Sequence, residues 1–354
     1  MAGQLITGRS GQNHVARIVA TCLILSALGI GSSRAEGNYQ LGAGKNIGPV
    51  NIAGYSNLEA DIPRAAPDEL SLDLSLLLSG HFSRYLNPFM EAEIDDWTLA
   101  RESGGAGSGN GVIERLYDDI DLTPSATLRL GKMLTPAGEW NLIHAPPLVW
   151  TVTRPLSTYY SFPEFVSGIS LNFRPSFDGF WDLQFYAQPG RDLFEKPAAY
   201  QPRQYSRVAG IDVRYSRDLL SQNRLGMALQ RAQLPQSGGS QILFSIYGGI
   251  STGPIRWSFQ VDTTDIRGEA AAIVHDHERG GYLQAVYAVT EHWFAVAQGE
   301  RFQSRDYRLA TTRRLLGMVY RPRSAISWKL DYLDATGAPV GSPTGVYAAW
   351  AVLF

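Results

Sequence analysis

Cysteine is almost absent from this sequence of 354 residues, where Cys22 is the only one. It lies within the first 35 residues, which we expect to be removed, so the remaining chain would carry no thiol. This excludes a disulfide scaffold and thiol-based catalysis in the mature chain. A chain without cysteine also suits export through an oxidising compartment.

Charge is scarce as well, because charged residues make up only 18% of the chain, against about 25% in ordinary soluble proteins. Without the first 35 residues, the chain would hold 28 basic and 33 acidic residues, a formal charge of −5. There is no basic run and no basic excess. We therefore expect no nucleic-acid partner.

Long apolar runs are missing too, apart from a short one near the start. Arg9 and Arg17 precede an apolar stretch over 18–30, and Ser33-Arg34-Ala35 supplies the small residues of a cleavage site. That stretch is shorter than the ~20 residues that span a bilayer. We predict a signal peptide at 1–35 and a periplasmic lead-in at 36–48. The rest of the chain is then either a soluble secreted protein or a membrane β-barrel.

Alternation of apolar and polar residues favours the barrel. Between Ile255 and Asp262 every second residue is apolar and the others are polar or charged, and the same pattern returns at 70–79, 181–188 and 326–332. A soluble β-sandwich also alternates. Here, however, tryptophan, tyrosine and phenylalanine gather near the ends of the apolar faces, as in the aromatic girdle of a membrane barrel.

The pattern predicts an all-β fold, a transmembrane antiparallel β-barrel over residues 49–354 with about sixteen strands, and fourteen to eighteen stays open. Short and long connections alternate between most of these strands, as periplasmic turns and external loops do in bacterial barrels, and both ends of the barrel would then lie in the periplasm. The predicted strands are 50–60, 70–80, 86–97, 112–122, 125–132, 166–174, 180–188, 207–216, 224–233, 240–249, 254–263, 280–289, 292–302, 311–320, 325–334 and 344–354.

The last predicted strand has a distinctive ending. Trp350, Val352 and Phe354 share one apolar face, and the chain ends on the aromatic residue. This ending resembles the signal that the barrel-assembly machinery reads in outer-membrane proteins. The resemblance implies that this machinery and outer-membrane lipids are partners of the chain.

A local motif points to a family. Leu130-Gly131-Lys132 followed by Thr135-Pro136-Ala137-Gly138 resembles the Leu-Gly-x-x-x-x-Pro-x-Gly stretch of Gram-negative outer-membrane porins related to the phosphate-selective porins. The resemblance implies a homotrimer in the outer membrane, passive diffusion of small solutes and no cofactor. Anion-selective members line the lumen with arginine and lysine. This chain mixes signs at the predicted lumen positions, so phosphate specificity does not follow.

The third external loop, 133–165, is the longest connection and is rich in proline and aromatic residues but poor in charge. We expect a loop with so few charges to be buried away from water. By analogy with porins we expect it to fold into the barrel and constrict the pore, whose width and lining charges set selectivity. The alternative is packing against neighbouring loops or against another subunit.

Strand parity predicts which charges face the lumen. Arg129 begins the constriction, Arg154 lies within it, and Glu139 is the expected acid opposite them. Acids concentrate in the early strands and bases in the later ones, so the two walls would set up a transverse field; the alternative is that these charges are only solvated or paired. The other predicted pore residues are Arg115, Asp119, Asp121, Arg214 and Arg256.

Two rival functions remain. His275 and His277 in the sixth external loop are weak candidates for a metal site or for a barrel enzyme such as a lipase or protease. The second rival function is that of a closed barrel used for adhesion or structure. We expect a porin without catalytic residues that passes small polar or charged solutes.

Overall fold

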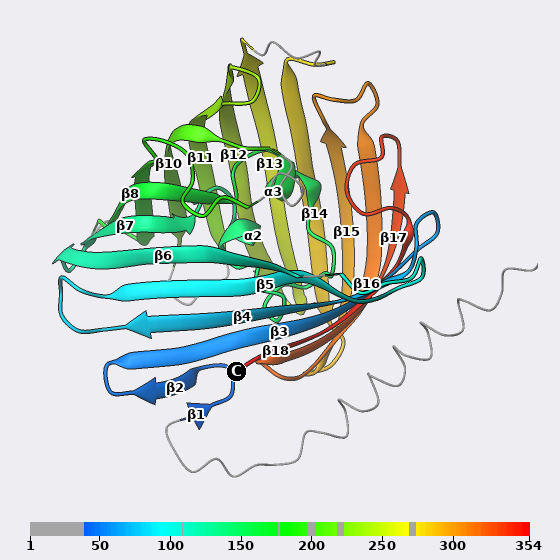
Figure 1. Cartoon of the computed structure of the whole chain (residues 1–354), viewed down its shortest axis with the longest axis horizontal. Coiled ribbons are helices and arrows are strands. Elements are labelled where there is room, and N and C mark those ends of the chain that lie inside the picture. Colours follow the sequence, from blue (N-terminus) through cyan, green and yellow to red (C-terminus); the bar gives the residue numbers. More distant parts are fainter. Residues whose placement is uncertain (1–38, 108, 176–177, 197–202, 218–222, 269–273) are drawn as a thin grey trace, which may run out of the picture.

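The computed structural model describes residues 39–107, 109–175, 178–196, 203–217, 223–268 and 274–354 (Figure 1). The expected signal peptide, 1–35, lies outside the described residues. Within the expected lead-in, β1 (Tyr39–Gln40) pairs with β2 (Gly44–Ile47), and β2 pairs with the first long strand through Lys45 and Ile52.

A closed antiparallel barrel of 16 strands follows, which confirms the predicted fold class. Each strand pairs with the next in sequence, and the last pairs with the first (Figure 1). The strands are β3 (Val50–Pro63), β4 (Glu69–Gly80), β5 (Pro88–Arg101), β6 (Asn110–Thr123), β7 (Ala126–Leu134), β8 (Phe165–Phe173), β9 (Phe180–Ala187), β10 (Ser206–Ser216), β11 (Arg224–Leu234), β12 (Gly239–Thr252), β13 (Ile255–Arg267), β14 (His277–Ala288), β15 (Trp293–Gln303), β16 (Thr311–Arg323), β17 (Ile326–Thr336) and β18 (Gly345–Leu353).

Alternation places the apolar side chains outside and the polar ones inside. On β11, Leu225, Met227 and Leu229 are 52%, 46% and 50% exposed on the outer face, whereas Gln230 is 1% exposed on the inner face. Water would penalise a continuous apolar belt of this kind, so the outer face requires lipid.

The C-terminus closes the ring. The N–H of Phe354 donates to the carbonyl of Gly54, and the N–H of Gly54 donates to the carbonyl of Phe354, each at 2.8 Å. A side chain at Gly54 would meet the ring of Phe354, so the terminal aromatic lies directly over this glycine. Trp350 faces Trp328 of β17 with 5.9 Å between ring centroids. The predicted ending is therefore the closing seam of the barrel.

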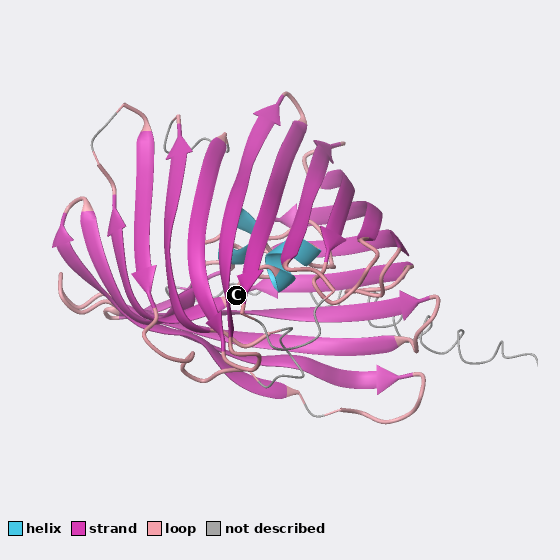
Figure 2. Ribbon diagram, turned by 90° about the horizontal axis from the view of Figure 1, so that it is seen from above, coloured by secondary structure: helices cyan, strands magenta, loops and turns pink. Residues whose placement is uncertain are grey.

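The third external loop folds inward as expected. Loop 3, which we define as residues 135–164, carries α2 (Glu139–Leu142) and α3 (Leu156–Tyr160), and both helices lie inside the ring of strands in two perpendicular views (Figures 1 and 2). No helix among the described residues is long and apolar enough to cross a membrane.

Candidate functional site: a lumen crossed by loop 3

Loop 3 starts and ends at a narrow neck. The N–H of Thr135 donates to the carbonyl of Glu164 at 2.9 Å. The side-chain amide of Asn141 donates to the carbonyls of Thr135 and Glu164, at 2.9 and 3.0 Å. Because Asn141 is fully buried, these bonds are shielded from water. The neck fixes where the loop enters the lumen.

Polar contacts attach the middle of loop 3 to β17. Lys329 Nζ donates to the carbonyls of Pro146 and Thr151 at 2.6 and 3.3 Å, and the N–H of Val152 donates to a carboxylate oxygen of Asp331 at 2.7 Å. Lys329 and Asp331 are both buried on the inner face of β17. Here they bind the loop backbone.

An apolar seam reinforces this attachment. Trp150 and Val152 pack against a buried group on the inner wall of β14–β18. The ring of Trp150 also lies 5.0 Å from that of Phe294. Buried apolar contact of this extent holds a loop that backbone hydrogen bonds alone would leave weakly attached. The wall group consists of Val286, Val296, Leu315, Val319, Leu333 and Tyr347.

Arg154 braces loop 3 from within. Its guanidinium pairs with Glu164, donates to Asn141 Oδ1 and to the carbonyl of Thr158, each at 2.7 Å, and lies 4.8 Å from the ring of Trp140. The side chain therefore has its hydrogen bonds satisfied inside the loop. It lies within loop 3 as predicted, and its contacts are with the loop itself.

Loop 4 (188–205) sends one lysine into the same region. Lys196 Nζ lies 2.8 Å from Glu114 on β6, 3.2 Å from Asp95 on β5 and 3.9 Å from Glu164 in loop 3. Burial opposes the charge of Lys196, but the three carboxylates together raise its pKa well above the usual value. Lys196 thus ties loops 3 and 4 to the barrel wall.

His144 of loop 3 also contacts Glu114. Its Nε2 lies 3.4 Å from Glu114, and its Nδ1 donates to the carbonyl of Asn141 at 2.9 Å. Burial lowers the pKa of His144, but the hydrogen bond and the charge of Glu114 outweigh it and raise the pKa. For Glu164 the balance is the opposite. Burial raises the pKa of this carboxyl, but the charges of Arg154 and Lys196 outweigh burial and bring the pKa below its usual value.

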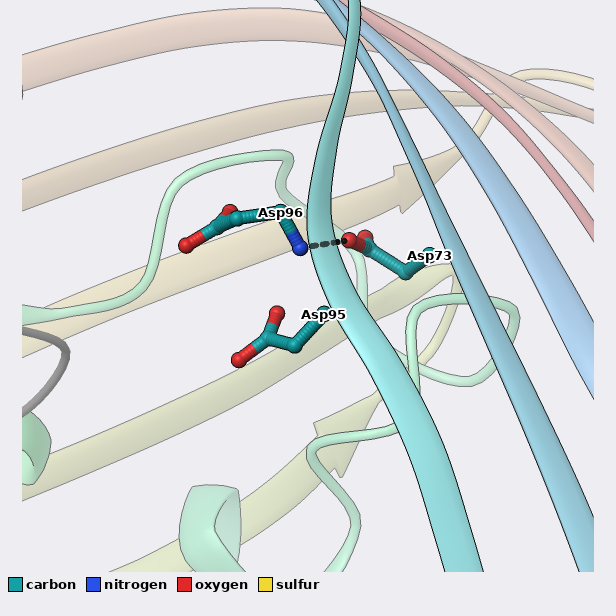
Figure 3. Close-up of side chains that lie close together, drawn as sticks. All are labelled: Asp73, Asp95 and Asp96. Atoms are coloured by element: carbon teal, nitrogen blue, oxygen red, sulfur yellow. Dashed lines mark hydrogen bonds between the residues drawn. The ribbon is translucent and has the colours of Figure 1, made fainter. Parts of the chain in front are cut away.

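An acidic group lies beside this network. Asp73 of β4 and Asp95 and Asp96 of β5 bring carboxylate oxygens within 4.8 Å of one another (Figure 3). They meet because the β4–β5 register shifts between Leu72 and Leu74, and the N–H of Asp96 donates to Asp73 at 3.0 Å across this shift. Glu91 and Glu93 point into the lumen from the same strand, where they are buried. The early acids therefore line the wall of β4–β6.

Most predicted lumen arginines are paired with acids. Arg115 pairs with Glu91, while Arg129 donates to both oxygens of Asp119 at 2.7 and 2.8 Å and lies 3.8 Å from the ring of Tyr117. Both arginines thus pair with acids of neighbouring strands. Asp121 accepts from Thr127 at 3.1 Å, and Arg214 lies 3.0 Å from both Asp182 and Asp212.

The opposite wall carries a basic group that is less fully paired. Glu139 of loop 3 pairs with Arg224 on β11, and not with Arg129 or Arg154. Arg321 and Arg256 lie 3.8 and 5.3 Å from the ring of Trp150. A cavity of about 380 Å³ separates loop 3 from this wall and is bordered by Arg224 and Arg256.

The histidine candidates lie elsewhere. His275 and His277 have ring centroids 5.6 Å apart, and His277 Nδ1 contacts the exposed carboxylate of Asp276 at 2.8 Å. Among the described residues, only Asp73, Asp95 and Asp96 form a group of three potential metal ligands. His275 precedes β14 and His277 is its first residue, and among the described residues neither belongs to such a group of three.

Sequence reasoning missed Lys196, His144 as a partner of Glu114, and Arg321. Arg321 was placed in a turn next to the end of a predicted strand, and the structure extends that strand, β16, to Arg323. Lys196 lies in a loop whose path no periodicity encodes. The surplus of early acids over early bases was the one available signal that a cation from elsewhere had to reach this wall.

Comparison with known proteins supports the fold. An OmpF porin of Salmonella typhi in complex with daunomycin has a TM-score of 0.60 at 11% identity, covering 86% of this chain and 97% of that one. An anion-selective porin of Comamonas acidovorans gives 0.57 at 14% identity, covering 86% and 98%. OpdK of Pseudomonas aeruginosa with vanillate gives 0.54 at 10% identity, covering 86% and 98%. The protein is an outer-membrane β-barrel of a Gram-negative bacterium.

Sequence comparison adds little about function. No known protein-family profile matches the chain. An uncharacterized protein of Aquifex aeolicus is 34% identical over 118 residues, which is 33% of this chain and 26% of that protein. The matched part thus spans about a quarter of that relative.

Proposed function

We propose that this protein is a porin, a channel for passive diffusion of small polar or charged solutes across the outer membrane. The observation that carries the proposal is that loop 3 enters a barrel of 16 strands and contacts both the acidic and the basic wall of a polar lumen, through His144 at Glu114 and Glu139 at Arg224. Barrels of this size leave room for an aqueous channel. An inserted loop with charged surroundings then sets which solutes pass.

The proposal includes export and assembly. Residues 1–35 would act as a cleaved signal peptide, and the seam formed by Phe354, Trp350 and Val352 would be read by the barrel-assembly machinery. A homotrimer in outer-membrane lipids fits the similarity to an OmpT of Vibrio cholerae described in a trimer form, with a TM-score of 0.57. No catalytic residue and no cofactor enter the proposal.

The test is single-channel conductance of the refolded protein in a planar bilayer, with the reversal potential measured under a salt gradient. Discrete conductance steps would support the porin. Arg129→Ala leaves Asp119 without its partner, so the reversal potential should shift toward cation preference. Arg154→Ala tests the brace of loop 3 and should change step size and current noise.

One outcome contradicts the porin, and a second contradicts the role given to loop 3. A verifiably folded barrel that passes no current is a closed barrel, and the apolar seam under Trp150 would then be the seal. Conductance that both arginine variants leave unchanged would remove loop 3 and its surroundings from the permeation path. Lipase and protease assays with His275→Ala and His277→Ala follow only in the first case.

A further inference from the structure

We propose that the cavity between loop 3 and the inner wall of β11–β14 binds a small organic acid, a monocarboxylate with a compact apolar body. This inference rests on the proposed porin function, because it names the class of solute that pauses in the channel. It stands on three observations: unpaired positive charge, an apolar floor and a matching volume.

The first observation is a local excess of positive charge. Arg224, Arg256 and Arg321 approach the same part of loop 3, and Glu139, at Arg224, is the one carboxylate among the described residues that contacts any of them. Within the described chain, Arg256 has no carboxylate within ion-pair distance. Among the residues that the structure describes, Arg321 donates only to the carbonyls of Leu148 and Val149, both at 3.1 Å, and its buried Nε has no partner.

Other inward arginines show that this is unusual for the lumen. Arg115 pairs with Glu91, Arg129 with Asp119, and Arg313 with Glu300 at 2.9 Å. The barrel therefore neutralises its lumen cations in most places and leaves two of them open here. Stacking on Trp150 contributes cation–π attraction but does not cancel their charge.

Geometry brings the two open cations together. Both guanidinium carbons lie over the ring of Trp150, at 3.8 and 5.3 Å from its centroid, so they are at most about 9 Å apart. Two like charges at this spacing repel each other in a partly dry site. A carboxylate in the cavity beside Arg256 would relieve that repulsion and gain charge-assisted hydrogen bonds.

The second and third observations define the body of the ligand. Trp140, Ile143 and Leu148 of loop 3 line the side of the cavity that faces the arginines. An inorganic anion would leave that apolar side in contact with water, whereas an apolar body would cover it. The volume of about 380 Å³ lies at the small end of the range for ligand pockets.

The site also continues toward the turn at 253–254. A second cavity of about 200 Å³ is bordered by Trp150, Arg256 and Pro254. Arg256 therefore lies between two spaces, one at loop 3 and one near the short-turn end of the barrel. This position suits a residue that passes an anion from one space to the next.

The experiment is calorimetric titration of the refolded barrel in detergent micelles with benzoate. Benzyl alcohol has the same ring without the charge, and inorganic phosphate has charge without the ring. We expect benzoate to bind and both comparison ligands to bind about tenfold more weakly or not at all. Arg256→Gln should weaken benzoate binding about tenfold. Arg301→Gln, an exposed arginine on the outer face of β15, should not change it.

The outcomes separate this site from the channel. Equal benzoate affinity in Arg256→Gln and Arg301→Gln would overturn the site, and so would phosphate binding as tight as that of benzoate. Benzoate binding without conductance would contradict the porin function and support the binding site. Conductance without benzoate binding would support the porin function and contradict the binding site. Circular dichroism and heat-shifted gel mobility confirm that each variant is folded.

Discussion

Lys196→Met should detach loops 3 and 4 from the acidic wall of the barrel. The substitution keeps most of the apolar stem and removes the one charge shared by Asp95, Glu114 and Glu164, at 3.2, 2.8 and 3.9 Å. The side chain of Lys196 is 8% exposed, so water cannot take over its role without local opening. The three acids would then face one another across the interface between loop 3 and the wall.

The magnitude follows from the kind of contact. Removing one partner of a buried ion pair costs about 3–5 kcal/mol, because the other charge stays buried. His144 and Arg154 still contact Glu114 and Glu164, so we expect the lower end, about 3 kcal/mol at neutral pH. That corresponds to an increase of roughly a hundredfold in the population with an open loop.

The effect should depend on pH in a defined direction. In the native protein the pKa of Glu164 is held below its usual value, so its contribution to stability is present above the unfolded pKa and is lost as pH falls through the folded pKa. Without Lys196, Glu164 keeps only Arg154 and His144 of the three groups that lower its pKa, and it takes up a proton at higher pH. The difference between Lys196→Met and the parent should therefore shrink below about pH 5.

The assay is unfolding of the refolded barrel followed by heat-shifted gel mobility, together with protease cleavage within loops 3 and 4. Lys45→Met is the matched control, because Lys45 is exposed on β2 and lies outside the barrel ring. The reasoning fails if Lys196→Met and Lys45→Met unfold alike at pH 7.5 and loop cleavage is equally slow. It also fails if the difference grows toward acid pH.

Three further predictions concern the loop and the closing seam. Gly138→Ala should destabilise the loop 3 insertion by about 1–3 kcal/mol, because φ is +87° there and a Cβ would meet the side chain of Gln260. Gly190→Ala, where a Cβ meets open space, is the control. Equal unfolding of the two variants would refute this prediction. Asp331→Asn weakens the bond from Val152 N–H and should raise current noise through loop motion; unchanged noise would count against loop 3 as the moving part. Deleting Phe354 removes both backbone bonds to Gly54 and should slow folding into vesicles, and an unchanged folding rate would show that closure does not limit assembly.

The strands could be predicted because their period is two and one face must meet lipid. On β7 the exposed side chain of Leu130 fixes the parity, and Arg129 then has to face the lumen. That one argument places Arg115, Asp119 and Arg214 as well. It needs only local sequence, which is why the barrel and the sides of its charges follow from the sequence.

Parity fails where both faces of a strand are apolar. Leu315 and Leu316 are adjacent on β16, yet Leu315 is 2% exposed and Leu316 is 67% exposed. Leu315 points inward because loop 3 covers it, and loop 3 can stay inside because Leu315 and its neighbours are apolar. Neither condition is visible in the strand alone. The partners of Arg154 were missed for the same reason, since they depend on the path of loop 3.

The charges explain why loop 3 crosses the lumen in one orientation. In a ring of 16 strands, β5 and β13 lie half a turn apart, with acids on the first side and Arg256 on the second. Loop 3 turns His144, whose pKa is raised by Glu114, toward the acidic wall and turns Glu139 toward Arg224 on the basic wall. The reversed orientation would set Glu139 against the acidic wall. Repulsion would then exclude it, even though the apolar seam alone would tolerate other positions. Asp73 with Asp96 and Arg256 with Arg321 are the charges left over on the two sides, and a solute in the proposed channel would meet them.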